Sequence, residues 1–155
     1  RIQQGKPVTP AFLFATFLWE PVRELARQLE AGGQHPAQAL QHAGSQIIAE
    51  QAKVMATPRR FSLPMREIWM LQMRLERKGG KRSLRVLGHP RFRAAYDFLL
   101  LRAEAGEVDN ELAEWWTEFQ EMHPQEQEKA VTRTRPSRKR RRRRPRRGGA
   151  ARETT

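Results

Sequence analysis

Cationic side chains between residues 58 and 102 are the groups in this sequence best suited to bind a ligand. Twelve Lys or Arg residues stand against three acidic residues, so the segment has a formal charge of +9. Aromatic and aliphatic residues interleave with the cations at helical spacing, as in surfaces that contact phosphate groups. We predict that the binding cations are Arg59, Arg60, Arg66, Arg74, Arg77, Lys78, Lys81, Arg82, Arg85, Arg91 and Arg93.

A second cationic block lies near the end of the sequence. Residues 133–155 hold twelve bases and one acid, and such a segment repels itself and is expected to be disordered when free. Arginine-rich segments of this kind bind RNA through its phosphates, although basic runs also serve nuclear import and binding to anionic lipid. The predicted RNA contacts of this tail are Arg138, Lys139, Arg140, Arg141, Arg142, Arg143, Arg144, Arg146 and Arg147.

Simpler interpretations exist for several of these features. The acidic stretch 107–121 is expected to be a solvated helix face, but it could also pair with the basic segment and mask part of it. The aromatic residues fall at helical spacing, which favours core packing over base stacking, and one of Trp115 and Trp116 must point partly outward. Three histidines precede prolines (His35, His89 and His123), which indicates helix boundaries rather than metal chemistry.

Nothing in the sequence supports catalysis by this chain. Two-metal chemistry needs carboxylates that lie close together, whereas the only aspartates are Asp97 and Asp109, on different expected helices. The turn at residues 79–82 lacks the rest of a phosphate-binding glycine loop. Cysteine is absent, which excludes a disulfide framework and thiolate zinc sites. We therefore assign no catalytic residue and no metal ligand.

The elements that would position the cations are all helical. Thr9 and Pro10 predict a helix start, Pro21 is expected to kink or break that helix, and glycine or proline marks the later boundaries. The longest apolar run, residues 11–19, is about half of the ~20 residues that a membrane helix needs. We predict a compact all-α bundle of about six or seven short helices over residues 1–122, followed by a disordered basic tail over residues 123–155.

Several stretches resemble the bacterial poly(A) polymerases. The similarity runs through residues 1–2, 7–14, 66–72, 80–82, 89–100, 115–116 and 119–120, and an arginine-rich tail follows. It covers about residues 1 to 122 and only the carboxy-terminal part of that family. Because the first residue is Arg1 rather than methionine, the chain is interpreted as a piece of a longer protein.

The resemblance implies an RNA-binding part of an enzyme that adds AMP from ATP to RNA 3′ ends. For the complete enzyme it implies a cytoplasmic polynucleotide adenylyltransferase that uses ATP and Mg²⁺ in mRNA processing. It implies no cofactor for this piece, because the family's catalytic Gly-Ser and paired-aspartate motifs lie in an amino-terminal head and match no position here. The expected partners are single-stranded RNA 3′ ends and RNA-decay proteins.

Three alternatives stay open at this point. The chain could be a stand-alone basic helical protein that binds nucleic acid. It could be a docking module for RNA-decay proteins, with the acidic helix and an outward tryptophan as its contact. It could also be the corresponding part of an enzyme that rebuilds the CCA end of transfer RNA, since nucleotide choice is made elsewhere in such enzymes.

Overall fold

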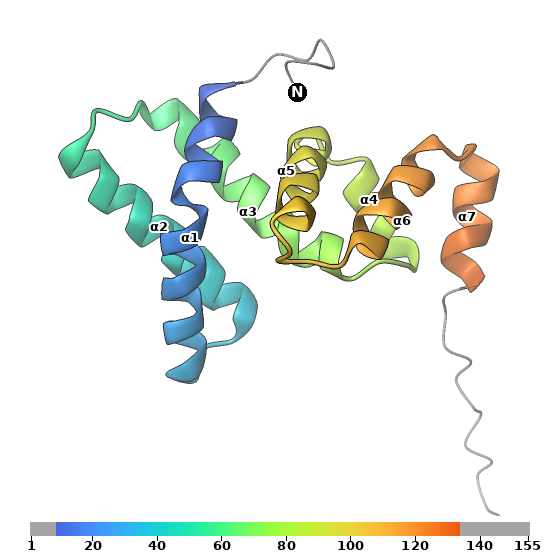
Figure 1. Cartoon of the computed structure of the whole chain (residues 1–155), viewed down its shortest axis with the longest axis horizontal. Coiled ribbons are helices and arrows are strands. Elements are labelled where there is room, and N and C mark those ends of the chain that lie inside the picture. Colours follow the sequence, from blue (N-terminus) through green and yellow to red (C-terminus); the bar gives the residue numbers. More distant parts are fainter. Residues whose placement is uncertain (1–8, 134–155) are drawn as a thin grey trace, which may run out of the picture.

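The computed structural model describes residues 9–133, and over this range the chain forms helices and turns without any strand (Figure 1). The all-α prediction and the number of helices are confirmed for this part of the chain. The seven α-helices are α1 (Pro10–Ala31), α2 (Pro36–Val54), α3 (Ser62–Glu76), α4 (Lys81–Leu87), α5 (Phe92–Glu104), α6 (Asn110–Glu121) and α7 (Pro124–Arg133), with a short 3-10 helix (Arg59–Phe61) before α3.

Helix α1 begins as the sequence predicts but does not break at Pro21. The Thr9 side chain accepts a hydrogen bond of 3.3 Å from the backbone N–H of Phe12, and Pro10 occupies the first turn. The helix then continues through Pro21 to Ala31, so of the predicted kink or break the break does not occur. A proline inside a helix costs about 3 kcal/mol. Burial of Trp19 and Val22 on either side of Pro21 outweighs that cost, because both halves of α1 pack into one core.

The first hydrophobic core lies between α1, α2 and α3. Trp69 of α3 is fully buried and donates a 3.0 Å hydrogen bond to the carbonyl oxygen of Ala15 in α1. Gly44 of α2 lies directly against the Trp69 ring, where a Cβ atom would come within 3.1 Å of Cε3. The absence of a side chain at Gly44 therefore lets α2 approach α3 closely.

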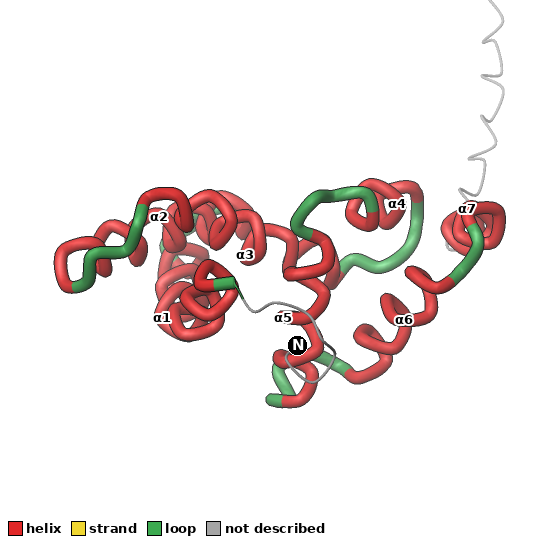
Figure 2. Tube along the Cα trace, turned by 90° about the horizontal axis from the view of Figure 1, so that it is seen from above, coloured by secondary structure: helices red, strands yellow, loops and turns green. Residues whose placement is uncertain are grey.

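The second core lies between the end of α3 and helices α4 to α7. Trp116 of α6 is fully buried and donates a 2.8 Å hydrogen bond to the carbonyl oxygen of Leu75 in α3. Ile68 of α3 belongs to the first core, whereas Leu71 and Leu75 belong to the second. Helix α3 is therefore shared by both halves of the fold, with α1 and α2 at one end and α4, α6 and α7 at the other (Figure 2).

Helix α7 forms from ten residues of the predicted tail, Pro124–Arg133. The tail was expected to begin at residue 123, but Pro124–Arg133 is helical and packs on α4. Gln127 and Val131 are buried, and the Gln127 side chain donates a 2.9 Å hydrogen bond to the Phe119 carbonyl oxygen. These two residues lie at i and i+4, so a helical signal was present in the sequence. The tail contacts predicted at residues 138–147 lie outside the described residues.

Two smaller points complete the fold. Asp109 occupies the N-cap position of α6. Its side chain makes no capping hydrogen bond, but its carbonyl oxygen accepts one of 3.1 Å from the backbone N–H of Leu112. Between residues 9 and 133, no helix is both long enough and apolar enough to cross a membrane.

Candidate nucleic-acid interface

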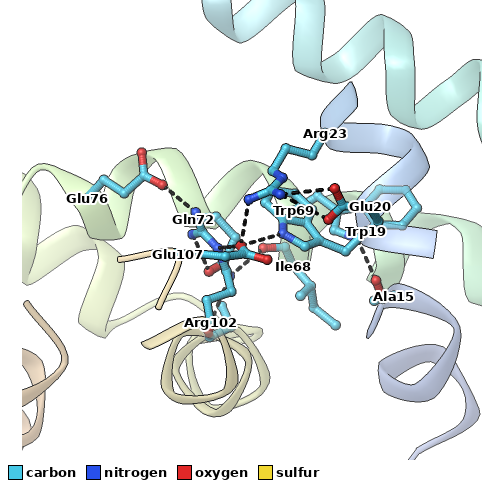
Figure 3. Close-up of polar contacts among 11 residues, drawn as sticks. Ala15, Trp19, Glu20, Arg23, Ile68, Trp69, Gln72, Glu76, Arg102 and Glu107 are labelled. Atoms are coloured by element: carbon cyan, nitrogen blue, oxygen red, sulfur yellow. Dashed lines mark hydrogen bonds and ion pairs between the residues drawn. The ribbon is translucent and has the colours of Figure 1, made fainter. Parts of the chain in front are cut away.

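The cations of residues 58–102 divide into those with partners inside the fold and those without. Arg102 is the clearest internal one, because only 7% of its surface is exposed. Its guanidinium binds Glu76 at 2.8 Å and Glu107 at 3.1 Å, and it lies 4.9 Å from the ring centroid of Trp19 (Figure 3). A side chain that is paired and buried in this way holds the fold together and is less available to a ligand than an exposed, unpaired arginine.

Glu107 is the acceptor at the centre of this internal network. Its Oε2 atom also accepts a 2.9 Å hydrogen bond from the Trp19 indole and lies 3.3 Å from Arg23 (Figure 3). Burial alone would raise the pKa of Glu107, but hydrogen bonds from Trp19 and Arg102 and the charges of Arg23 and Arg102 outweigh burial and hold its pKa below the ordinary value. The carboxylate therefore stays ionised and holds α1, α5 and the loop before α6 together.

Two of the predicted binding cations also have partners within the fold. Arg91 forms a 2.9 Å ion pair with Glu67 of α3. Arg93 lies 3.7 Å from the carboxylate of Asp97 and donates a 3.3 Å hydrogen bond to Gln120. Spacing along one helix could have shown only the Arg93–Asp97 pair, because Glu67 and Gln120 come from other helices. Both arginines are therefore less available for phosphate than the net charge of residues 58–102 suggests.

Four other arginines line one concave pocket, which we call the arginine pocket. Two come from the end of α3 and two from α4, and the pocket has a volume of about 470 Å³. Within residues 9–133 these four guanidinium groups make no ion pair, and no acidic residue lines the pocket. The full lining is Arg74, Arg77, Arg82, Arg85, His35, Ala37, Met70, Met73 and Val86.

A tight turn brings the two pairs of arginines together. Gly79 and Gly80 both have positive φ angles, of 96° and 71°, which allow the chain to reverse between α3 and α4. The Ser83 hydroxyl fastens this turn, because it accepts a 2.9 Å hydrogen bond from the Gly79 N–H and donates one of 3.2 Å to the Gly79 carbonyl. Arg82 and Arg85 are three residues apart in α4 and share a face, while Arg77 follows Arg74 directly after the end of α3.

A second, shallower depression lies along the same side of α3. It has a volume of about 320 Å³ and is lined by Arg59 and Arg66 together with neutral residues of α2 and of the segment that leads to α3. The α3 residues that line the two hollows, among them Arg66 and Arg74, fall at helical intervals on one side of the helix. Arg60 nearby lies 4.9 Å from the Phe61 ring. We call this face, from Arg59 to Arg85, the α2–α3 seam.

The two predicted lysines lie apart from the seam or at its margin. Lys78 lines a separate hollow with four acidic residues, so its charge is locally opposed. Lys81 is exposed at the start of α4, beside the arginine pocket but not in its lining. The four acids near Lys78 are Glu76, Glu107, Asp109 and Glu111.

The acidic helix α6 does not mask the seam. Its outward acids are exposed and form no ion pair with the basic segment in the part of the chain that the structure describes. Of the acidic stretch 107–121, only Glu107 pairs with that segment there, at Arg102. Of the adjacent tryptophans, Trp116 is buried and Trp115 is partly exposed and stacked on Phe119 at 4.7 Å, so the prediction of one outward ring is confirmed.

Histidine 35 is the lining residue that sequence reasoning missed. Its Nδ1 accepts a 3.3 Å hydrogen bond from the backbone N–H of Ala37, which caps α2 as the His-Pro pattern indicates. The same ring also lines the arginine pocket, about 40 residues from the arginines. No local pattern in the sequence could have shown that His35 meets these arginines.

Over residues 9–133 no group of three or more His, Cys, Asp or Glu residues could hold a metal ion.

Comparison with known proteins gives the family. Residues 32–148 match the family described as "Polymerase A arginine-rich C-terminus". The chain is 42% identical over 163 aligned residues to poly(A) polymerase I of Escherichia coli O6:H1, an alignment that covers all of this chain and 34% of the relative. It is 38% identical over 154 residues to the Haemophilus influenzae protein of the same name, with 95% of this chain and 34% of the relative covered.

A further relative shows the same partial coverage. Poly(A) polymerase I of Salmonella typhi is 40% identical over 133 residues, which are 82% of this chain and 28% of the relative. The chain thus spans about a third of the length of the curated relatives it matches. The chain therefore belongs to the polymerase A arginine-rich C-terminus family and is homologous to the carboxy-terminal region of poly(A) polymerase I.

Proposed function

We propose that this chain holds RNA for a poly(A) polymerase, which as a whole adds AMP from ATP to RNA 3′ ends. The observation that carries the proposal is the arginine pocket, where four guanidinium groups converge without an acidic partner among the described residues. Unpaired arginines are suited to phosphate, because a guanidinium can donate two parallel hydrogen bonds to phosphate oxygens.

The α2–α3 seam would contact the strand along its backbone. Arg66 and Arg74 are eight positions apart in α3, which corresponds to about 12 Å along a helix that rises 1.5 Å per residue. The cations thus border an extended path rather than a single point. Phosphate contacts position a strand without reading its bases, so we expect binding with little sequence preference.

The basic tail would act as a second, less specific contact. Residues 133–155 hold twelve bases, and they follow a folded part that carries its own cationic face. Such a tail would raise the local concentration of RNA and retain the product between successive additions. We expect deletion of residues 134–155 to weaken RNA binding and to reduce its dependence on salt.

We assign ATP and Mg²⁺ to the part of the enzyme that this chain does not contain. Asp97 is buried beside Arg93, and Asp109 begins α6, so the two aspartates do not form a pair that could hold metal ions. No residue of this chain is therefore given a catalytic role. We further propose that the complete enzyme acts in the cytoplasm and works with RNA-decay proteins.

The relatives favour the polyadenylating role over the alternatives. Those described above are named poly(A) polymerase I, not CCA-adding enzymes or stand-alone binding proteins. The internal pairing of Arg102, Arg91 and Arg93 also leaves the free cations on the α2–α3 seam, where a strand could follow them.

Binding measurements on the complete chain test this function. Oligo(A), duplex DNA and transfer RNA would be titrated by filter binding across a salt series. We expect single-stranded RNA to bind most tightly, and Arg74→Gln to reduce that affinity about fivefold, equivalent to about 1 kcal/mol for an exposed charge pair. Lys129→Gln is the matched control, because Lys129 is an exposed cation on α7, away from the seam. Equal affinities for all three nucleic acids, or equal losses in both variants, would refute the proposal.

A further inference from the structure

The arginine pocket has a floor that phosphate binding alone does not explain. Met70, Met73 and Val86 line it together with the four arginines and His35. Both methionines are only partly buried: they pack against the first core and also line the hollow. An apolar floor beneath a cationic rim is the arrangement expected for a ligand with one charged part and one flat, apolar part.

We propose that the arginine pocket is a discrete site for one nucleotide that carries two phosphate groups. The proposal rests on the RNA-holding function and deepens it, since it names one subsite along the α2–α3 seam. The two phosphates would bind the arginines of α3 and α4, and the base would lie on the two methionines. Thioether sulfur makes favourable contacts with aromatic rings, and a guanidinium plane can stack on a base.

Size and charge both fit such a ligand. The volume of about 470 Å³ lies within the range of roughly 300 to 1,000 Å³ that is typical of small-molecule sites. Four like charges in one hollow repel one another, and no carboxylate lines the pocket to offset them. An anion with several negative charges relieves this repulsion, whereas a neutral nucleoside does not.

The nucleotide could come from two sources that share this chemistry. It could be a nucleotide within an RNA strand, with the phosphates on either side of it, or a free nucleotide such as ATP, with its phosphates in a chain. The strand is favoured by the pocket's position, because the shallower hollow with Arg59 and Arg66 continues the same face of α3. Adenosine 3′,5′-bisphosphate is the smallest probe that reproduces the strand-borne case.

Methyl signals of methionine provide a readout at the pocket itself, separate from the total binding of nucleic acid. The chain has five methionines, and carbon-13 labelling of their methyl groups gives one signal for each. Met70 and Met73 line the pocket, whereas Met55, Met65 and Met122 do not and serve as internal controls. Met70→Leu and Met73→Leu variants assign the two signals.

The experiment titrates the complete chain with adenosine 3′,5′-bisphosphate, ATP, pyrophosphate and adenosine. We expect the bisphosphate to move the Met70 and Met73 signals in a saturable way, and Arg74→Gln combined with Arg85→Gln to weaken this binding at least tenfold. Tighter binding of ATP than of the bisphosphate would support the site and identify a free nucleotide as its source. If pyrophosphate and adenosine each bind more weakly than the bisphosphate, the result would support joint recognition of phosphate and base.

Two results would overturn the inference. One is that the Met70 and Met73 signals stay fixed while oligo(A) still binds, which would leave the proposed function intact. The other is that pyrophosphate binds as tightly as the bisphosphate, which would show that the apolar floor has no role. If oligo(A) itself fails to bind, the proposed function fails separately.

Discussion

The indole of Trp19 in α1 donates a 2.9 Å hydrogen bond to Glu107, which lies 88 residues further along the chain in the loop before α6. Trp19 belongs to the first hydrophobic core, and Glu107 also holds Arg102 of α5. This contact therefore ties the α1–α2–α3 half of the fold to the half that carries α5 and α6. The arginine pocket likewise takes residues from both halves.

Replacement of Glu107 by glutamine is expected to destabilise the fold by about 1 to 3 kcal/mol, because buried Arg102 and Arg23 lose a charged acceptor. This loss of stability is smaller than the cost of leaving a buried charge without any partner, because Arg102 keeps its ion pair with Glu76. Urea unfolding measures the effect. Glu114→Gln, an exposed acid on α6, is the control and should change the free energy of unfolding by less than about 0.5 kcal/mol.

The lowered pKa of Glu107 makes the stability of the fold depend on pH. Below the ordinary value of 4.5 the unfolded chain takes up a proton at this carboxyl group, while the folded chain does not until the pH passes the lower folded pKa. The stabilisation is thus fully present above about pH 4.5 and is lost as the pH falls through the folded pKa. Thermal unfolding between pH 3 and pH 7 should show a steeper decline for the unaltered protein than for Glu107→Gln. Parallel curves would contradict this account of Glu107.

Alanine at position 44 is expected to destabilise the contact between α2 and α3. The new Cβ atom would lie 3.1 Å from the Trp69 ring, which is buried and fixed by its hydrogen bond to Ala15. Overpacking of this kind costs about 1 to 3 kcal/mol, and the better helix propensity of alanine returns up to about 1 kcal/mol. Gly88→Ala is the control, because its added Cβ meets no atom closer than 3.6 Å. A shift in melting temperature for Gly88→Ala as large as that for Gly44→Ala would contradict the packing argument.

Arginines of the basic segment should differ in their effect on RNA affinity according to their partners in the fold. Arg93 lies beside Asp97 and Gln120, whereas Arg74 has no ion pair among the described residues. We expect Arg93→Gln to change the affinity for oligo(A) less than about twofold and Arg74→Gln to lower it about fivefold. Fluorescence anisotropy with labelled oligo(A) measures both. An equal loss in the two variants would mean that net charge, not the seam, determines binding.

Local patterns were sufficient to predict most of the helices and which side chains they bury. Met65, Ile68 and Leu75 recur at helical spacing, which predicts that they form the inner side of a helix, and the structure buries all three. The same reasoning missed α7, because its inner side offers only Gln127, Ala130 and Val131 within a polar stretch. It also overestimated Pro21, since the sequence does not show that both halves of α1 pack into one core.

The candidate site was only partly predictable, for a different reason. Composition located the cationic segment, but whether each cation is free depends on contacts between distant residues. Arg91 meets Glu67 across 24 positions and Arg102 meets Glu76 across 26, and neither pair follows from spacing along one helix. The meeting of α3, α4 and the start of α2, which forms the arginine pocket, likewise exists only in the folded chain.

The salt dependence of RNA binding tests the central claim most directly. The logarithm of the oligo(A) association constant would be plotted against the logarithm of salt concentration for two variants that each lack two cations. Arg74→Gln with Arg85→Gln removes charge from the arginine pocket, and Arg93→Gln with Lys129→Gln removes it elsewhere. With a slope of about 0.7 per phosphate contact on a single strand, we expect the first variant to lower the slope by about 1.4 and the second to leave it nearly unchanged. Equal slopes in the two variants would contradict the account.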